Sequence, residues 1–189
     1  MRVAAKRTAM REACVALFRA VNVGGRSLPM ADLRAALEEL GFAGVRTLLQ
    51  SGNAVFTPPA APGRTLERRI EAALVERFGL RADVFVRSRA DVDTIVAANP
   101  FPHEAAHDPA RLVVMVLEAA PSEDEAGAVR SAVVGREQVR RGTRHLYLYY
   151  PDGQGTSKLT NAVIERRLGM RGTARNWNTV LKIRDALAH

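Results

Sequence analysis

The same order of secondary-structure elements is predicted twice along the sequence, and this repeat constrains the fold more than any other feature. Apolar residues that recur every three or four positions predict helices, whereas short apolar segments bounded by Gly, Pro or Asn predict strands. In the first half these patterns predict strands at 13–21, 45–50, 54–57 and 83–87, a helix between Pro29 and Leu40, and a second helix at 65–78.

The second half begins with another apolar strand at 112–117. Ser122 and Glu125 have the spacing of a capping box and predict the start of the next helix, as Ser88 and Asp91 do for a helix that runs to about residue 98. The remaining predicted elements are strands at 137–141 and 144–150, a helix at 158–168, and a closing helix at 177–187 in the place of a final strand.

The repeated βαββα order predicts an α+β fold of two ferredoxin-like (βαββα-type) subdomains in tandem, with antiparallel sheets and helices packed on them. We expect a basic disordered arm at 1–12 and a proline-rich connector at 99–109. The first subdomain, with its connecting helix, is then 13–98, and the second, with a C-terminal helix, is 110–189.

The chain is basic, with a net charge of +8, and clustered basic residues attract phosphate groups. Residues 1–12 supply +3 of this charge, and only Lys6, Lys158 and Lys182 are lysines among the 28 basic residues. The remaining body of the chain is therefore only moderately basic.

The single cysteine, Cys14, excludes an internal disulfide and lies in an apolar run, where we expect a buried structural thiol. No stretch approaches the roughly 20 apolar residues that span a bilayer, and no secretory signal is evident. We therefore expect a cytoplasmic protein without membrane contact.

The segment between the strand at 144–150 and the following helix carries the most suggestive chemistry. Glycine lets backbone N–H groups approach an anion, a helix start adds the positive end of its dipole, and lysine adds a mobile charge. The loop lacks the spacing of a Walker A or dinucleotide motif, and the alternative is a plain turn in which the serine is the helix N-cap. The candidate anion-binding residues are Gly153, Gly155, Ser157, Lys158 and Thr160.

Three further polar clusters are candidates because together they offer amides, a guanidinium and an indole, which suit a phosphorylated or nucleobase-bearing ligand. Each also has a structural explanation, since Asn and Gly favour turns and Trp favours a core. The clusters are Asn22, Gly24 and Gly25; Ser51, Gly52 and Asn53; and Arg175, Asn176 and Trp177.

Residues His103, Glu104 and His107 spell the H-E-x-x-H pattern of zinc proteases. That motif requires a full helix, whereas three prolines between residues 100 and 109 leave room for little more than one turn. No third ligand is evident, so we expect exposed loop histidines and no metal.

The strand that contains His145, Tyr147 and Tyr149 places rings on one face of a sheet, as in domains that stack RNA bases. The RNP1 signature is absent, and half-buried tyrosines are common in strands. Base stacking remains an alternative to a purely structural role.

Five segments resemble successive motifs of the DUF 1697 family (domain of unknown function), over nearly all of residues 13–185. They are FRAVNVGGRSLPMADLRAALEELGF, LLQSGNAVF, NPFP, YPDGQGTSKLTN and TARNWNTVLKI, in that order. The resemblance implies an α+β fold with duplicated ferredoxin-like subdomains. The family has no established activity, so it implies no reaction.

The residues favour a binding module for an anionic, phosphate-bearing small ligand, with no cofactor. Non-specific binding of RNA or DNA is one alternative. An enzyme that acts on a phosphorylated substrate, with Lys158 as electrophile, is another, although no acid and base pair is evident.

If the basic residues form a nucleic-acid surface, a labelled single strand should bind with an affinity that falls steeply as salt rises, because released counterions drive such binding. Removal of residues 1–12 should flatten that slope in a fluorescence titration. Lack of binding at low salt would rule out this surface.

Overall fold

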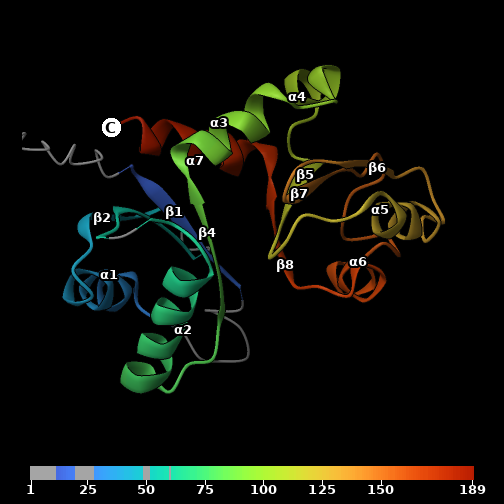
Figure 1. Ribbon diagram of the computed structural model, residues 1–189. Coiled ribbons are helices and arrows are strands. Elements are labelled where there is room, and N and C mark those ends of the chain that lie inside the picture. Colours follow the sequence, from blue (N-terminus) through green and yellow to red (C-terminus); the bar gives the residue numbers. More distant parts are fainter. Residues whose placement is uncertain (1–11, 20–27, 49–51, 60) are drawn as a thin grey trace, which may run out of the picture.

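The computed structural model describes residues 12–19, 28–48, 52–59 and 61–189, and everything below concerns these residues (Figure 1). The first half contains β1 (Cys14–Arg19), α1 (Met30–Glu39), β2 (Ala43–Leu48), β3 (Asn53–Thr57), α2 (Arg64–Phe78) and β4 (Asp83–Ser88). Two helices follow, α3 (Arg89–Ala97) and the short α4 (Pro102–His107) within the predicted connector. The second half contains β5 (Leu112–Leu117), α5 (Glu123–Arg130), β6 (Gln138–Arg141), β7 (His145–Tyr149), α6 (Asn161–Leu168), β8 (Gly172–Asn176) and α7 (Trp177–Leu187).

The described strands form two antiparallel four-stranded sheets with equivalent strand orders, β2-β3-β1-β4 and β6-β7-β5-β8. In each sheet the first strand of its half lies between the third and the last. The prediction of an α+β fold with antiparallel sheets in two similar halves is therefore confirmed. Assignment of each half to the ferredoxin-like class stays a prediction.

The prediction that a closing helix replaces the final strand is wrong, because β8 precedes α7 and completes the second sheet. The sequence of β8, GTARN, has no apolar alternation, and pairing with the buried β5 makes it a strand. Gly172 permits this pairing, since a Cβ there would lie 2.8 Å from Met115 and 3.0 Å from the carbonyl oxygen of Val116.

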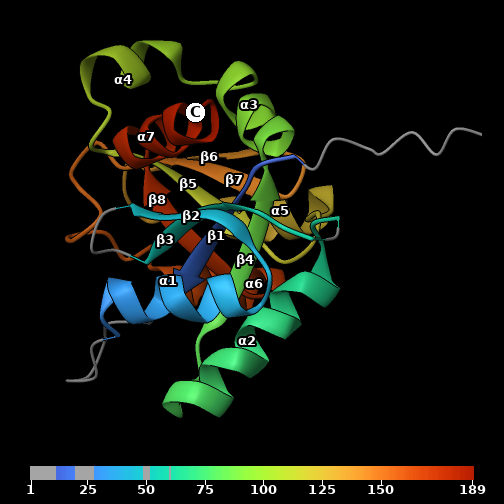
Figure 2. The same ribbon diagram turned by 90° about the vertical axis from the view of Figure 1, so that its left-hand side faces the viewer.

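The apolar side chains form three layers. One cluster lies between the first sheet and helices α1 and α2, and another between the second sheet and helices α5 and α6. A third, the shared layer, joins the inner faces of both sheets to α3 and α7, which lie side by side over the sheets (Figures 1 and 2). Strands β1 and β5 are buried on both faces, which explains why both are continuous apolar runs.

Cys14 is fully buried in β1, as predicted, and burial raises the pKa of its thiol to about 12. The thiolate is the reactive form of cysteine, and it is not populated at neutral pH with such a pKa. Cys14 is therefore a small apolar group of the core.

Buried Arg87 in β4 joins the two halves. Its guanidinium donates hydrogen bonds to the carbonyl oxygens of Leu117 and Arg144 in the second half and of Val86 in its own strand. The carboxylate of Glu67, itself fully buried, lies 3.8 Å from Arg87 and also accepts the N–H of Val86. This arrangement satisfies a charge that would otherwise be costly to bury.

A more exposed network of ion pairs lines the edge between the halves. Arg19 and Arg171 both pair with Asp83, Arg19 also pairs with Glu165, and Arg171 with Glu118. Because exposed pairs contribute little individually, this network fixes the orientation of the halves more than it stabilises the fold.

The inner face of β7 is covered, so its rings do not form an open base-stacking surface. Tyr147 is 1% exposed, and its hydroxyl donates to the carbonyl oxygen of Ile95 in α3 at 2.8 Å. His145 packs edge-on against Tyr147, and Gly142 leaves room for its ring. Tyr149 is half-buried and bonds Asp108.

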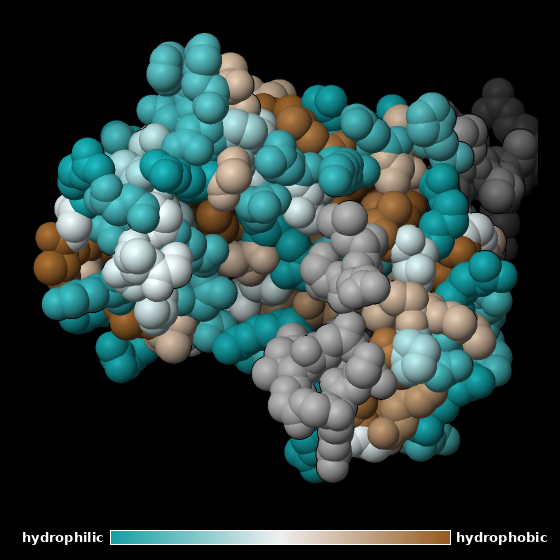
Figure 3. Space-filling view, turned by 180° about the vertical axis from the view of Figure 1, so that it is seen from behind, coloured by the Kyte–Doolittle hydropathy of each residue, from teal (hydrophilic) through white to brown (hydrophobic). Residues whose placement is uncertain are grey.

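None of the helices in the described part of the chain has the length and apolar character needed to cross a membrane. Figure 3 shows one face of the molecule, on which apolar residues gather in small separate patches between hydrophilic ones. Such scattered patches need no binding partner to explain them.

Burial, with the nearby charge of Arg87, lowers the pKa of His145 from 6.5 to about 4. The unfolded chain therefore binds a proton between these two pH values that the folded protein does not bind, and stability is lost as the pH falls through this window. From pH 7.5 to pH 5, this residue alone should cost about 2 kcal/mol of the free energy of unfolding.

Urea unfolding at both pH values should show this loss in the wild-type protein and a smaller one in His145→Phe, which keeps a ring but has no proton to bind. The matched control is His103→Phe, at an exposed histidine. An equal pH dependence in wild type and His145→Phe would contradict the assignment.

Candidate functional site

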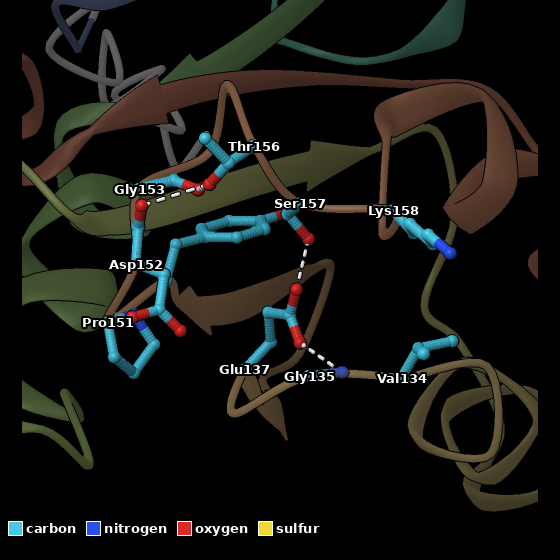
Figure 4. Close-up of a pocket in the computed structure, with 10 residues that line it drawn as sticks. Val134, Gly135, Glu137, Pro151, Asp152, Gly153, Thr156, Ser157 and Lys158 are labelled. Atoms are coloured by element: carbon cyan, nitrogen blue, oxygen red, sulfur yellow. Dashed lines mark hydrogen bonds between the residues drawn. The ribbon is translucent and has the colours of Figure 1, made fainter.

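The loop between β7 and α6, residues 151–160, lines a pocket of about 210 Å³ (Figure 4). The predicted residues Gly153, Ser157 and Lys158 line it, and Gly155 and Thr160 do not. Sequence reasoning missed Glu137 and Asp152, which bring two carboxylates to the same pocket.

The plain-turn alternative required Ser157 to be the N-cap of the helix, and the structure shows that it is not. Helix α6 begins three residues later than predicted, and Thr160 caps it by accepting the N–H of Val163 at 3.3 Å. Leu159 is buried and its carbonyl oxygen accepts the hydroxyl of Tyr150, so the chain stays non-helical up to the cap. The Ser157 oxygen accepts the N–H of Leu159 at 3.0 Å, and its hydroxyl donates to Glu137 in the pocket.

The carboxylate of Glu137 lies between two donors of the pocket. The hydroxyl of Ser157 donates to one oxygen, and the N–H of Gly135 donates to the other at 3.0 Å (Figure 4). The hydrogen bond from Ser157 holds the pKa of Glu137 below its usual value. The pocket therefore contains a pair of donors around one carboxylate, and Glu137 of the protein itself supplies that carboxylate.

Lys158 is exposed, and Figure 4 shows its side chain pointing away from the Ser157–Glu137 hydrogen bond. Among the described residues, no carboxylate lies within ion-pair distance of its ammonium group. Asp152, by contrast, pairs with Arg136, and this hydrogen bond lowers the pKa of Asp152. Lys158 is thus the one basic group among the described lining residues, and it forms no ion pair with either carboxylate there.

Two of the other predicted clusters meet at the junction between the halves. Arg175 of β8 donates to the side-chain oxygen of Asn53 at 2.7 Å and to the carbonyl oxygens of Phe18 at 2.9 Å and Gly52 at 3.2 Å. Burial lowers the pKa of Arg175 to about 10. The predicted residues Asn22, Gly24, Gly25 and Ser51 lie outside the described residues.

The neighbours of Arg175 have structural roles. Asn176 is the N-cap of α7 and accepts the N–H of Thr179 at 2.9 Å, and Trp177 is buried in the shared layer. Neither Arg175 nor Asn176 is among the described residues that line the pocket at 151–160. The pocket at 151–160 and the Arg175 junction are therefore separate.

The H-E-x-x-H segment forms the six-residue helix α4, in agreement with the limit set by its prolines. His103 and His107 are exposed and their rings stack at 4.4 Å. No group of three or more metal-ligating side chains occurs among the residues described.

Replacement of Arg175 by Met should lower the free energy of unfolding by about 3 kcal/mol, because four carbonyl or amide oxygens lose a hydrogen bond from a guanidinium, those of Phe18, Gly52, Asn53 and Ala174. Arg166→Met, at an exposed position on α6, should change it by less than about 0.5 kcal/mol. Urea denaturation of both variants measures the difference, and equal stabilities would show that the junction is not held by Arg175.

Comparison with known proteins assigns the chain to a family. A sequence model described as "Protein of unknown function (DUF1697)" matches residues 11–147, and no curated protein matches the chain. The solved structure of the conserved bacterial protein SP0830 from Streptococcus pneumoniae is similar, with a TM-score of 0.73 and 21% identity over 93% of this chain and 98% of that one. This likeness concerns the fold alone. Because the family model covers most of the chain, the protein belongs to the DUF1697 family, whose function is unknown.

Proposed function

We propose that the protein binds a small anionic ligand, and that the loop at 151–160 holds the phosphate or carboxylate group of that ligand. The observation that carries the proposal is the cradle around Glu137, in which Ser157 and the N–H of Gly135 both donate to one carboxylate. Hydrogen bonds from hydroxyl and backbone donors to a charged acceptor are stronger than neutral ones. The same donors suit the oxygens of an external anion.

The external anion competes with Glu137 for these donors. Two carboxylates in one cradle repel each other, so the ligand binds when the side chain of Glu137 swings out. Glu137 is half-buried, and this movement breaks its hydrogen bonds with Ser157 and Gly135. Lys158 then adds a mobile charge at the rim.

The two alternatives have less support. An enzyme needs a base matched to its working pH, and the lowered pKa of Glu137 makes this carboxylate a weak base for Ser157. Nucleic-acid binding by base stacking loses its surface, because the inner face of β7 is covered by α3. A cytoplasmic location stays a prediction from the sequence.

The charge of Glu137 should weaken anion binding, and the charge of Lys158 should strengthen it. Thermal-shift titration with inorganic phosphate, nucleotides and sugar phosphates should therefore give larger shifts for Glu137→Gln than for wild type, and smaller shifts for Lys158→Ala. A ligand at 100 times its dissociation constant stabilises the fold by about 2.7 kcal/mol, which such a titration detects readily.

The matched control is Lys182→Ala, which removes an exposed lysine of α7 and the same formal charge. Every ligand shift should persist in this variant. If Lys158→Ala and Lys182→Ala behave alike, or if Glu137→Gln binds no anion better than wild type, the loop is not an anion site.

A further inference from the structure

A second pocket lies between the two halves, at the other end of β7 from the loop at 151–160. It has a volume of about 390 Å³, and its polar lining includes Arg87, Asp91, Arg144 and His145. Ile95 and Ala120 add apolar surface. This size lies within the range of pockets that hold small organic ligands.

Two guanidinium groups line this pocket, and they are unequally neutralised. Arg87 has the carboxylate of Glu67 at 3.8 Å, but Glu67 is shared with Arg64 at 3.2 Å and with the backbone of β4. Arg144 has no carboxylate within ion-pair distance among the described residues. Among the described residues, the side chain of Arg144 donates one hydrogen bond, from Nη2 to the carbonyl oxygen of Glu118 at 3.0 Å.

Arg87 and Arg144 line the same pocket, and the charge of Arg144 acts on Arg87. Burial is the larger cause that lowers the pKa of Arg87 to about 10, and the charge of Arg144 lowers it further. An anion bound between them would relieve this repulsion, and guanidinium groups suit phosphate and carboxylate because their N–H groups form a fork.

The other polar groups of the pocket do not neutralise the arginines fully. Asp91 is the one carboxylate among the lining residues described, and its Oδ2 accepts the N–H of Ser88 in the capping box of α3. His145 is 3% exposed and its low pKa keeps it neutral, while its Nε2 has no hydrogen-bond partner among the described residues. The described lining residues thus include two arginines and one aspartate, and no carboxylate among them pairs with Arg144.

We propose that this pocket between the halves binds the phosphate or carboxylate group of a small organic molecule between Arg87 and Arg144, with the apolar part of that molecule against Ile95 and Ala120. This site is independent of the proposed function of the loop at 151–160, because the two pockets share no lining residue. A ligand here contacts both halves and stabilises their arrangement.

Calorimetric titration of the full chain with phenyl phosphate and with benzoate tests the proposal, because the two probes share a ring and differ in the anion. At least one probe should bind to wild type, and Arg144→Gln should raise its dissociation constant by about tenfold or more, the effect of losing a hydrogen bond to a charged group. Arg68→Gln, at an exposed arginine of α2, removes the same charge and should leave the dissociation constant unchanged.

The side-chain resonances of His145 give a readout that needs no arginine variant, since they should shift in the wild-type protein as the probe is added. The same shift in Lys158→Ala would separate this site from the loop. The proposal is overturned if neither probe moves these resonances, or if Arg144→Gln and Arg68→Gln bind the probe equally. Binding that is lost in Lys158→Ala and kept in Arg144→Gln would support the loop and overturn this site.

Discussion

The shared apolar layer is the interaction on which the rest of the structure depends. Both sheets are covered by helices on their outer faces and meet the shared layer on their inner faces, so β1 and β5 have no face toward water. A half separated from its partner would expose Val15, Leu17, Val114 and Val116, and apolar burial is worth roughly 25 cal/mol per Å². The two halves are therefore parts of one folding unit.

Polar groups at the rim of this layer set how the halves meet. Arg87 reaches from the first half to carbonyl oxygens of the second, and Arg175 reaches from the second half to carbonyl oxygens of the first. Apolar contact has no direction, whereas a guanidinium requires acceptors at fixed angles. The arginines thus give a unique relative orientation to two surfaces that apolar packing alone would allow to slide.

Both candidate sites follow from this architecture. The loop at 151–160 leaves the second sheet at the end of β7, and the pocket with Arg87 and Arg144 lies where the beginning of β7 faces the first half. Each site contains a basic group without a carboxylate partner among the described residues, Lys158 in one and Arg144 in the other. Other basic groups that lie near these sites do pair with carboxylates, for example Arg136 with Asp152 and Arg171 with Glu118.

Local sequence determined the order of the elements, because helix and strand periods, the capping boxes at Ser88 and Ser122, and the apolar runs of β1 and β5 are encoded within a few residues of each other. It also placed Gly153, Ser157 and Lys158 in one loop. It did not reveal β8, whose five residues become a strand only through pairing with β5, nor the cap at Thr160, which depends on the burial of Leu159. Other contacts join residues that are 20 to 122 positions apart in the sequence. They are the contacts of Glu137 with Ser157, of Arg175 with Asn53, and of Arg87 with Arg144. Tertiary structure alone brings them together, because hydrogen bonds and ion pairs depend on distance in space and leave no periodic pattern in the sequence.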